Sequence, residues 1–427
     1  MYNRVFDEIL LKEIRAKFAF LDYDPTYGKR LFLDNAGGAL RLTSSIIEKN
    51  FWDLLPDCPL RYHQRAIDLN VLMDKTQNEI LSTMLGAKSG SIVTAISASA
   101  VFFKVARAIV ESTNIKNGNV VTTNVEHPSA YDAVKIYAER NNLEFRVVEV
   151  NQKTGFIEPE KVAELVDKNT VLVSVIAASN ISGNIMDLEK INHLIKEKNK
   201  DVYFISDGVQ HVPHGAMDVE KEGLDFVNFA PYKFYATRGI GFGYVSKRVA
   251  NMFHDKLEAK DTDDWTVGTP APSLYASMLE VIDYACWVGS KFSNSKNRRE
   301  LYQEGMKKIS EQERYLLNFL LEGDDKVKGL RYINGVEIYV DNKDLEKRDL
   351  IIAMGIKGLS YTEAVNRYRD MGIIVFDRIN TSLYSKRIVE SLGLTGAIRV
   401  SPVHCHNENE MREFLIATQK IIESLKN

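Results

Sequence analysis

Residues 202–247 read VYFISDGVQHVPHGAMDVEKEGLDFVNFAPYKFYATRGIGFGYVSK, and this stretch decides the fold. Two short runs rich in β-branched and aromatic residues end at Ile205 and Phe229, and each predicts a buried strand. An acid, Asp207, follows the first run, Gln210 comes three residues later, and the second run leads to a lysine, Lys233. Ligands of open α/β sheets bind beyond the carboxyl ends of the strands, so we expect these side chains to share a site.

An acid and a lysine at neighbouring strand ends suit pyridoxal phosphate. The lysine can form a Schiff base with the cofactor aldehyde, and the acid can keep the pyridine nitrogen protonated so that the ring accepts electrons. We therefore expect Lys233 to be the Schiff-base residue and Asp207 the partner of the ring nitrogen. For any single lysine, the alternative is a loop position without chemistry.

The pattern around this stretch predicts an α/β fold. From residue 91 to 245, short apolar runs alternate with helical spacing at 101–111, 129–140, 159–166 and 187–198. Such continuous apolar runs joined by helices favour a mainly parallel sheet covered on both faces. Residues 271–290 and 297–322 look helical, and a different alternation from residue 329 onward predicts a small α+β domain.

Length and composition are those of an ordinary globular protein. The chain has 427 residues, a formal net charge of −3, 45% hydrophobic and 26% charged residues, so about two domains are expected. The charge gives no electrostatic reason to expect nucleic acid or an anionic membrane, and no apolar run is long enough to span a bilayer. The N-terminal stretch, residues 1–18, carries acids and is unlike a signal peptide. Three widely separated cysteines (Cys58, Cys286, Cys405) predict free thiols in a reducing, cytoplasmic compartment.

The 202–247 stretch resembles the class V aminotransferase family of pyridoxal phosphate enzymes. The family pattern D-G-A-Q-x-x-x-H, D-F, S-x-H-K and G-x-x-G-I-G is matched by residues 207–210, His214, 225–226, 230–233 and 238–241. Cysteine desulfurases, selenocysteine lyases and isopenicillin N epimerase-like enzymes are the most similar branches. The resemblance implies fold type I: a large domain with a mostly parallel seven-stranded sheet, and a small α+β C-terminal domain. We expect an N-terminal helix packing with the small domain (1–29), a large cofactor domain (30–292) and a small domain (293–427).

The resemblance also implies the cofactor-binding residues. The turn 97–100, a polar N-terminus of a helix, occupies the place of the phosphate-binding loop, with Ala98 and Ser99 as amide or hydroxyl donors. His127 takes the place of the histidine stacked on the pyridine ring, where an imidazole can also relay protons. Asn180 and Gln210 are expected to donate toward the phenolic oxygen. The alternatives without chemistry are helix caps and asparagine turns.

Further positions follow from the same family pattern. Gly268-Thr269-Pro270 matches G-T-P, which implies that Thr269 reaches the phosphate bound by a second subunit and that the protein is a homodimer with interface sites. Arg399 matches the arginine that grips the substrate carboxylate, a task for which its planar fork is suited. Asn35 belongs to the segment that lines the substrate side. No metal ligands are expected, because adjacent residues such as His404-Cys405-His406 rarely share one ion.

Two departures bear on the reaction. Ala230 and Tyr232 stand where the family usually has serine and histidine, so a tyrosine hydroxyl replaces some phosphate donors. In one desulfurase branch the catalytic cysteine lies nine residues before the glycine of a Leu-Gly pair; here that position is Tyr384, counted from Gly393. We expect Tyr384 to contact the substrate, which a tyrosine can orient or protonate. Cys405 lies on the far side of Arg399, so no acceptor thiolate is visible.

The sequence therefore predicts a pyridoxal phosphate enzyme that acts at Cα of a small amino acid. The leading hypothesis is a C–S or C–Se lyase or a transaminase without a persulfide-forming cysteine. A true cysteine desulfurase, an amino-acid epimerase and a non-catalytic binding scaffold with the same fold remain alternatives.

Overall fold

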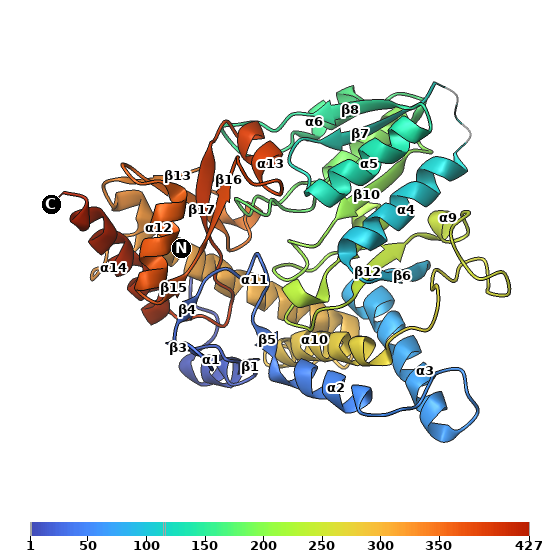
Figure 1. Cartoon of the computed structure of the whole chain (residues 1–427), viewed down its shortest axis with the longest axis horizontal. Helices are drawn as coiled ribbons and strands as arrows, with labels where there is room; N and C mark the ends of the chain where they lie inside the picture. The colour runs from blue at the N-terminus through green and yellow to red at the C-terminus, as the bar shows by residue number, and fades with distance from the viewer. Residues whose placement is uncertain (1, 114, 116, 427) are drawn as a thin grey trace.

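A mostly parallel seven-stranded sheet forms the centre of the computed structural model, which describes residues 2–113, 115 and 117–426 (Figure 1). Strand β12 pairs antiparallel with both of its neighbours, and the other pairings are parallel. This confirms the expected α/β sheet. Its strands, in spatial order, are β6 (Ser91–Ala95), β12 (Gly241–Val245), β11 (Phe226–Phe229), β10 (Tyr203–Asp207), β9 (Thr170–Ser174), β7 (Asn119–Thr123) and β8 (Glu144–Val148).

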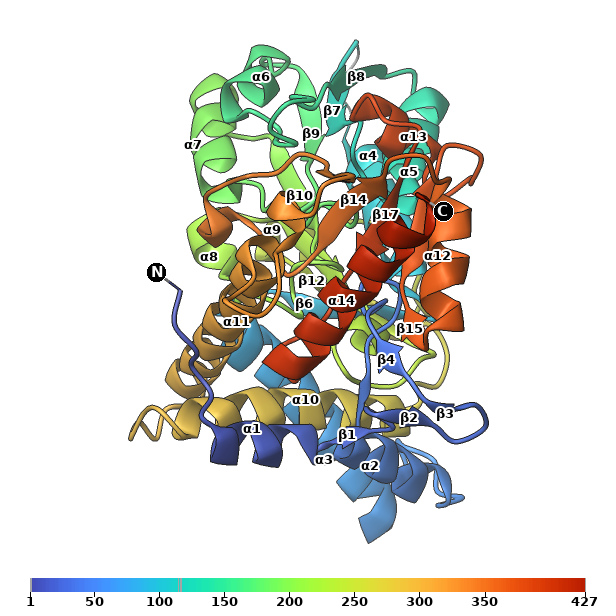
Figure 2. The same cartoon turned by 90° about the vertical axis from the view of Figure 1, so that its left-hand side faces the viewer.

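Helices cover both faces of the sheet, as its apolar strands require. Figure 2 shows α4 (Ala98–Ser112) and α5 (Pro128–Arg140) on one side, and α6 (Pro159–Glu164), α7 (Leu188–Lys198) and α8 (Val219–Glu222) on the other. The α4–α5 side forms a buried cluster with strand residues such as Val120 and Ile205. Strand residues of the opposite face, such as Val173 and Phe204, belong to a larger cluster that includes α7 and α10 (Pro272–Ser290).

The N-terminal region lies along α10. Helices α2 (Thr43–Asp53) and α3 (Gln64–Asn78) pack against α10, and α3 continues into a π-helical turn, Glu79–Met84. Helix α1 (Glu8–Arg15) precedes a series of two-residue strands. Those strands are β1 (Phe18–Ala19), β2 (Tyr23–Asp24), β3 (Gly28–Lys29), β4 (Leu31–Phe32) and β5 (Arg41–Leu42).

The C-terminal part forms a second, four-stranded sheet with its own core. Its strands, in spatial order, are β13 (Val336–Ile338), β14 (Ile352–Ile356), β17 (Gly396–Val400) and β16 (Phe376–Ile379). Helices α12 (Tyr361–Asp370) and α14 (Glu408–Ser424) contribute to its buried cluster, together with the C-terminal half of α11 (Arg298–Glu322). The remaining elements are α9 (Lys247–Ala250), α13 (Lys386–Ser391), β15 (Ile373–Ile374) and the 3₁₀ turns Pro231–Lys233, Leu330–Tyr332 and Leu345–Lys347.

Both chain ends contribute to the junction of the two cores. Leu11 and Ile14 of α1 belong to the large cluster, while Arg15 pairs with Glu410 of α14 at 2.8 Å. Strand β4 pairs in parallel with β15, so the chain near Leu31 joins the C-terminal cluster. The N-terminal helix thus contacts both cores. The expected domain bounds at residues 29 and 292 stay a prediction. Within the described residues, no helix combines the length and apolarity needed to cross a bilayer.

Candidate active site

The carboxyl ends of β10 and β11 bring an acid and a lysine to one edge of the large sheet. Asp207 is the last residue of β10 and lies opposite Asn228 in the parallel pairing with β11. Strand β11 ends at Phe229, and the 3₁₀ turn Pro231–Lys233 then turns the lysine back over the edge, with its amide donating to the Ala230 carbonyl at 2.9 Å. The sheet topology therefore places both side chains at the position expected from the sequence.

A hollow of about 510 Å³, including its open mouth, lies at this edge. Its wall is built by the turn before α4, the N-terminus of α5, the segment after β9 and the ends of β10 and β11. Seven of the residues that the sequence assigned to the cofactor line it together with the lysine: Ala98, Ser99, His127, Asn180, Asp207, Gln210 and Tyr232. The structure thus brings the predicted constellation together in one concave site.

Lys233 lies in an environment that favours its neutral amine. Burial is the main cause that lowers the pKa of Lys233 to about 7, and the charge of Arg399 acts in the same direction. Its Nζ lies 3.5 Å from the Gln210 Oε1 atom. A lysine that can lose its proton near neutrality is suited to act as a nucleophile and as a general base.

Asp207 is a buried carboxylate with few hydrogen bonds. Burial raises the pKa of Asp207 to about 6, although the Val209 amide, 3.1 Å from Oδ1, and the charge of Lys233 oppose the shift. A carboxylate held in this way is stabilised by a cationic partner. The protonated pyridine nitrogen of pyridoxal phosphate is such a partner.

The N-terminus of α4 lies at the same hollow and is suited to bind an anion. Ser97 caps the helix, its Oγ accepting from the Ala100 amide at 3.1 Å, which leaves earlier amides of the first turn free. Gly241 of β12 approaches this turn so closely that a Cβ atom there would lie 2.1 Å from the Ala98 nitrogen. The buried Oδ1 atoms of Asn180 and Asn228 have no partner among the described residues. A phosphate-bearing ligand with polar ring substituents fits this donor and acceptor set.

His127 is held as a neutral imidazole at the start of α5. Burial, followed by the charges of Lys233, Arg378 and Arg387, lowers the pKa of His127 to about 3. Its Nδ1 lies 3.2 Å from the Ser129 amide, so this nitrogen accepts and the ring proton lies on Nε2. The ring of Tyr384 lies roughly parallel to it, with the centroids 6.5 Å apart. A neutral, flat ring at this place suits stacking on a cofactor.

The residues assigned to substrate binding lie on the side of the small domain. Arg399 on β17 is buried; its Nη1 donates to the Asn180 carbonyl at 3.1 Å, and its Nη2 lies 2.7 Å from Asp34 Oδ1. The side chain of Asn35 stabilises the turn between Asn35 and Leu40 and ties it to Ser401. Its Nδ2 donates to the Ser401 carbonyl, and its Oδ1 accepts from the Leu40 amide. Tyr384, between β16 and α13, is 65% exposed and does not line the hollow, but its ring lies next to that of His127, which does. We refer to this exposed rim as the mouth of the site.

Thr269 does not line the hollow within this chain. It belongs to the segment between α9 and α10, where Gly268 adopts a positive φ of 82°. The role expected for Thr269, at the phosphate of a second subunit, therefore stays a prediction.

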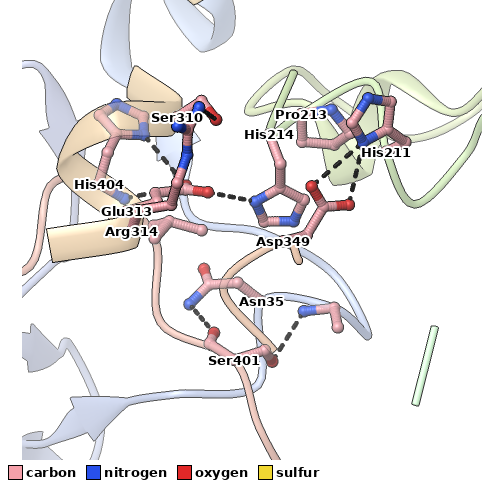
Figure 3. A network of polar contacts seen from close by, with 12 residues as sticks. Asn35, His211, Pro213, His214, Ser310, Glu313, Arg314, Asp349, Ser401 and His404 are labelled. Atoms are coloured by element: carbon pink, nitrogen blue, oxygen red, sulfur yellow. Dashed lines mark hydrogen bonds and ion pairs between the residues drawn. The ribbon is translucent and has the colours of Figure 1, made fainter. Parts of the chain in front are cut away.

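A buried polar network that the sequence did not reveal supports the site from behind. Figure 3 shows Glu313 of α11 between His214 and His404. Its Oε2 lies 2.7 Å from His214 Nδ1, and its Oε1 accepts from the His404 amide at 3.2 Å. His214 Nε2 in turn lies 3.4 Å from Gln210 Nε2. Glu313, ninety-nine positions from His214, thus lies behind Gln210 of the hollow, and only its helical spacing marks it in the sequence.

Three more residues of the site were missed. Asp34 and Arg378 lie beside Arg399, and Arg387 donates to the carbonyls of Asn124 and Glu126 at 2.6 and 2.8 Å. Asp34 directly precedes Asn35, and Arg378 lies in an apolar strand pattern, which are signals that could have found them. Among the described residues, no three His, Cys, Asp or Glu side chains gather as metal ligands. His404 instead bonds to Tyr284 at 2.7 Å.

A match to a family model shows to which family the chain belongs. The model described as aminotransferase class-V matches residues 59–413, which is most of the chain. The chain belongs to the class V aminotransferase family. Its cofactor is pyridoxal phosphate, and it is an enzyme of the pyridoxal phosphate-dependent type. The fold is fold type I, as the resemblance implied.

Known relatives of the class V chain carry desulfurase names. A probable cysteine desulfurase of Borreliella burgdorferi is 26% identical over 384 residues, which cover 85% of this chain and 84% of the relative. The cysteine desulfurase IscS of Clostridium botulinum is 31% identical over 144 residues, or 33% of this chain and 35% of the relative.

Solved structures show the same fold. The apo structure of a cysteine desulfurase from Thermococcus onnurineus has a TM-score of 0.81 at 20% identity and covers 97% of this chain and 98% of that one. A cysteine desulfurase of Escherichia coli has a TM-score of 0.78 at 16% identity and covers 98% and 99%.

Proposed function

We propose that this class V enzyme cleaves a C–S or C–Se bond, or transfers an amino group, on a small amino acid without passing sulfur through a cysteine of its own. The observation that carries the proposal is the residue at the mouth of the site. Tyr384 occupies the position of the desulfurase thiolate, counted from Gly393, and lies against His127. A tyrosine hydroxyl can orient a substrate or donate a proton, but it does not accept sulfur.

The cysteines of the chain support the same proposal. Cys405 and Cys286 are buried, and burial raises the pKa of Cys286 to about 11 and that of Cys405 well above its usual value. A thiol with a raised pKa carries little thiolate and is a weak nucleophile. Cys58 is exposed between α2 and α3 and does not line the hollow. All three are free thiols.

The residues of the hollow can carry out the proton transfers at Cα. When bound, pyridoxal phosphate withdraws electrons from Cα of the substrate. Lys233 Nζ, with a pKa of about 7, can remove the Cα proton and return it near neutral pH. Arg399 can orient the α-carboxylate of the substrate. The neutral ring of His127 can exclude water from one face of the site and present a planar surface there.

A cysteine desulfurase is the second candidate, because the relatives reported above carry that name. Such an enzyme needs a thiolate within reach of the substrate sulfur, which is the point at which the two functions differ.

A homodimer is part of the proposal. Family members act on amino acids and are commonly dimeric. Helices α2 and α3 and the segment between them expose a group of large apolar side chains, among them Phe51, Leu54, Leu60, Tyr62 and Val71. Large exposed apolar side chains gathered on one part of the fold favour an interaction site. A second copy that covers it would complete the class V site.

An amino-acid panel tests the reaction. Purified enzyme is incubated with cysteine, selenocysteine, alanine and aspartate, with and without an α-keto acid, and ammonia, pyruvate, sulfide and new amino acid are measured together. Sulfide or selenide with pyruvate supports the lyase, and keto-acid-dependent amino transfer supports the transaminase. Alanine together with a persulfide on the enzyme would instead support the desulfurase.

A further inference from the structure

Two arginines lie side by side on one face of the small sheet. Strands β16 and β17 are antiparallel, with Arg378 opposite Ala397 and Phe376 opposite Arg399. Opposite and alternate residues point to the same face, so Arg378 and Arg399 are diagonal neighbours. Both are more than nine-tenths buried, with 8% and 2% of their surface exposed.

This pair borders the cofactor hollow. Arg399 donates from Nη1 to the carbonyl of Asn180, a residue that lines the hollow. Arg378 donates from Nη2 to the Tyr384 carbonyl at 3.0 Å, at the mouth. The positive charge of Arg378 also acts on Lys233 and His127, lowering the pKa of each, which places its guanidinium near both. The contact with Asn180 therefore places the pair next to the lining of the hollow, on the side of the small domain.

One resident carboxylate compensates this pair. Asp34 Oδ1 lies 2.7 Å from Arg399 Nη2. In the part of the chain that the structure describes, no carboxylate lies within ion-pair distance of Arg378. Asp377, the next residue on β16, points to the other face and bonds to Thr362. The Nε atoms of both arginines are buried and lack a partner among the described residues. Two buried cations with one anion leave one positive charge uncompensated, and one further anion can balance it.

We propose that Arg378 is a second substrate-binding residue, which grips the α-carboxylate together with Arg399, and that Asp34 restricts the site to amino acids without an acidic side chain. The α-carboxylate supplies the missing charge, and the free donors of Arg378 and of Arg399 Nε can bind it. An acidic side chain would bring a third anion next to Asp34, where neither arginine of the pair is left to compensate it. The inference rests on the proposed amino-acid chemistry and names the class of substrate.

Binding of unreactive carboxylates to the holoenzyme tests both parts. Propionate carries one carboxylate and succinate carries two, and neither has an amino group, so calorimetry measures recognition without turnover. The loaded cofactor also blocks the phosphate site for these probes. In the parent enzyme, we expect succinate to bind no tighter than propionate.

The variants separate the two roles. Arg378→Gln should weaken propionate binding by about tenfold to a hundredfold, as for a lost charged hydrogen bond. Arg378→Lys should restore part of the affinity, because it keeps the charge but not the planar fork. Asp34→Asn should make succinate bind more tightly than propionate, since the resident anion is gone. Asp377→Asn, which changes a charge on the opposite face of the same strand, is the matched control and should leave both affinities unchanged.

An unchanged propionate affinity in Arg378→Gln would overturn the role of Arg378. A parent enzyme that prefers succinate, or an Asp34→Asn variant that gains nothing for it, would overturn the role of Asp34. Cofactor absorbance and circular dichroism confirm folding, and Arg378→Lys decides the first part if the glutamine variant does not fold. Because the probes do not react, this outcome is independent of the amino-acid panel that tests the reaction.

Discussion

Glu313 Oε2 lies 2.7 Å from His214 Nδ1, at the end of a buried row of side chains that reaches Lys233 through Gln210. Burial opposes the charged imidazole, but the charge of Glu313 and the hydrogen bond to it raise the pKa of His214 to about 9. The pKa of Glu313 is lowered in turn, despite burial, mainly by the charge of His214. The pair is therefore ionised at neutral pH, and it lies directly behind Gln210.

Glu313→Gln should destabilise the protein in a pH-dependent manner. The raised pKa of His214 stabilises the folded protein fully below about 6.5, and this contribution is lost as the pH rises through about 9. The lowered pKa of Glu313 stabilises the folded protein fully above about pH 4.3, and this contribution is lost as the pH falls through the lowered pKa. We expect the variant to lose about 3 kcal/mol at pH 6, the cost of breaking a buried pair, and less at pH 9.5.

Urea unfolding of the apoprotein at both pH values measures this difference. Glu363→Gln, which removes an exposed pair with Arg367, is the control and should cost about 1 kcal/mol or less. Equal losses for Glu313→Gln at pH 6 and pH 9.5 would show that the carboxylate acts through packing and not through its charge.

Lys233→Ala should abolish the covalent attachment of the cofactor. Borohydride reduction of the parent enzyme should fix the cofactor to one lysine, and mass spectrometry of the digest should find it on the peptide that contains Lys233. Lys135, an exposed residue of α5, provides the control, and Lys135→Ala should keep the adduct. An adduct that persists in Lys233→Ala would remove the basis of the lysine assignment.

Asp207→Asn should keep the cofactor bound but lose most of the turnover. The amide preserves the size of the side chain but cannot hold a positive charge on the ring nitrogen. Loss of a charged hydrogen bond is worth about 1.5–3 kcal/mol, or roughly tenfold to a hundredfold in rate. Asp201→Asn, an exposed change just before β10, should have no effect on kcat. Near-parental turnover in Asp207→Asn is the result that contradicts this role.

The large sheet and the centre of the site could be predicted from the sequence because their signals are local. Strands β10 and β11 are apolar runs with their functional residues directly at their ends, so the topology rule alone places Asp207 beside Lys233. The six helices expected from their spacing, α4, α5, α6, α7, α10 and α11, likewise begin and end within a few residues of the expected positions.

What could not be predicted depends on distant contacts. Glu313 meets His214 across ninety-nine positions, and Asp34 meets Arg399 across 365. No spacing rule links such residues, since only the packing of the two cores brings them together. Asn35 was placed on the substrate side by resemblance, yet its side chain bonds to Ser401 and Leu40, and its neighbour Asp34 makes the contact with Arg399.

Thr269→Ala should weaken cofactor binding if a second subunit completes the site. Mixing Lys233→Ala subunits with Thr269→Ala subunits at limiting cofactor should then restore activity, because one site in each mixed dimer carries neither change. Sedimentation and exchange of labelled subunits establish that mixed dimers form. Activity that stays at the level of the unmixed variants, with exchange confirmed, would show that the site belongs to a single chain.

Turnover should not need a cysteine of the enzyme. Replacing Cys58, Cys286 and Cys405 together, the first by serine and the buried pair by alanine, should leave kcat within a few-fold of the parent, provided that cofactor absorbance shows a folded enzyme. Tyr384→Phe should lower kcat with little effect on KM if the hydroxyl donates a proton to the leaving group, since the ring can still lie against His127. Leu383→Ala, which alters the adjacent exposed side chain, is the control for disturbance of this segment. If one cysteine replacement abolishes turnover in a folded, loaded enzyme, and mass spectrometry finds a persulfide on that residue in the parent, the protein passes sulfur through its own thiol. The desulfurase name of its relatives would then apply to this chain as well, and Tyr384 would be a residue that only shapes the mouth of the site.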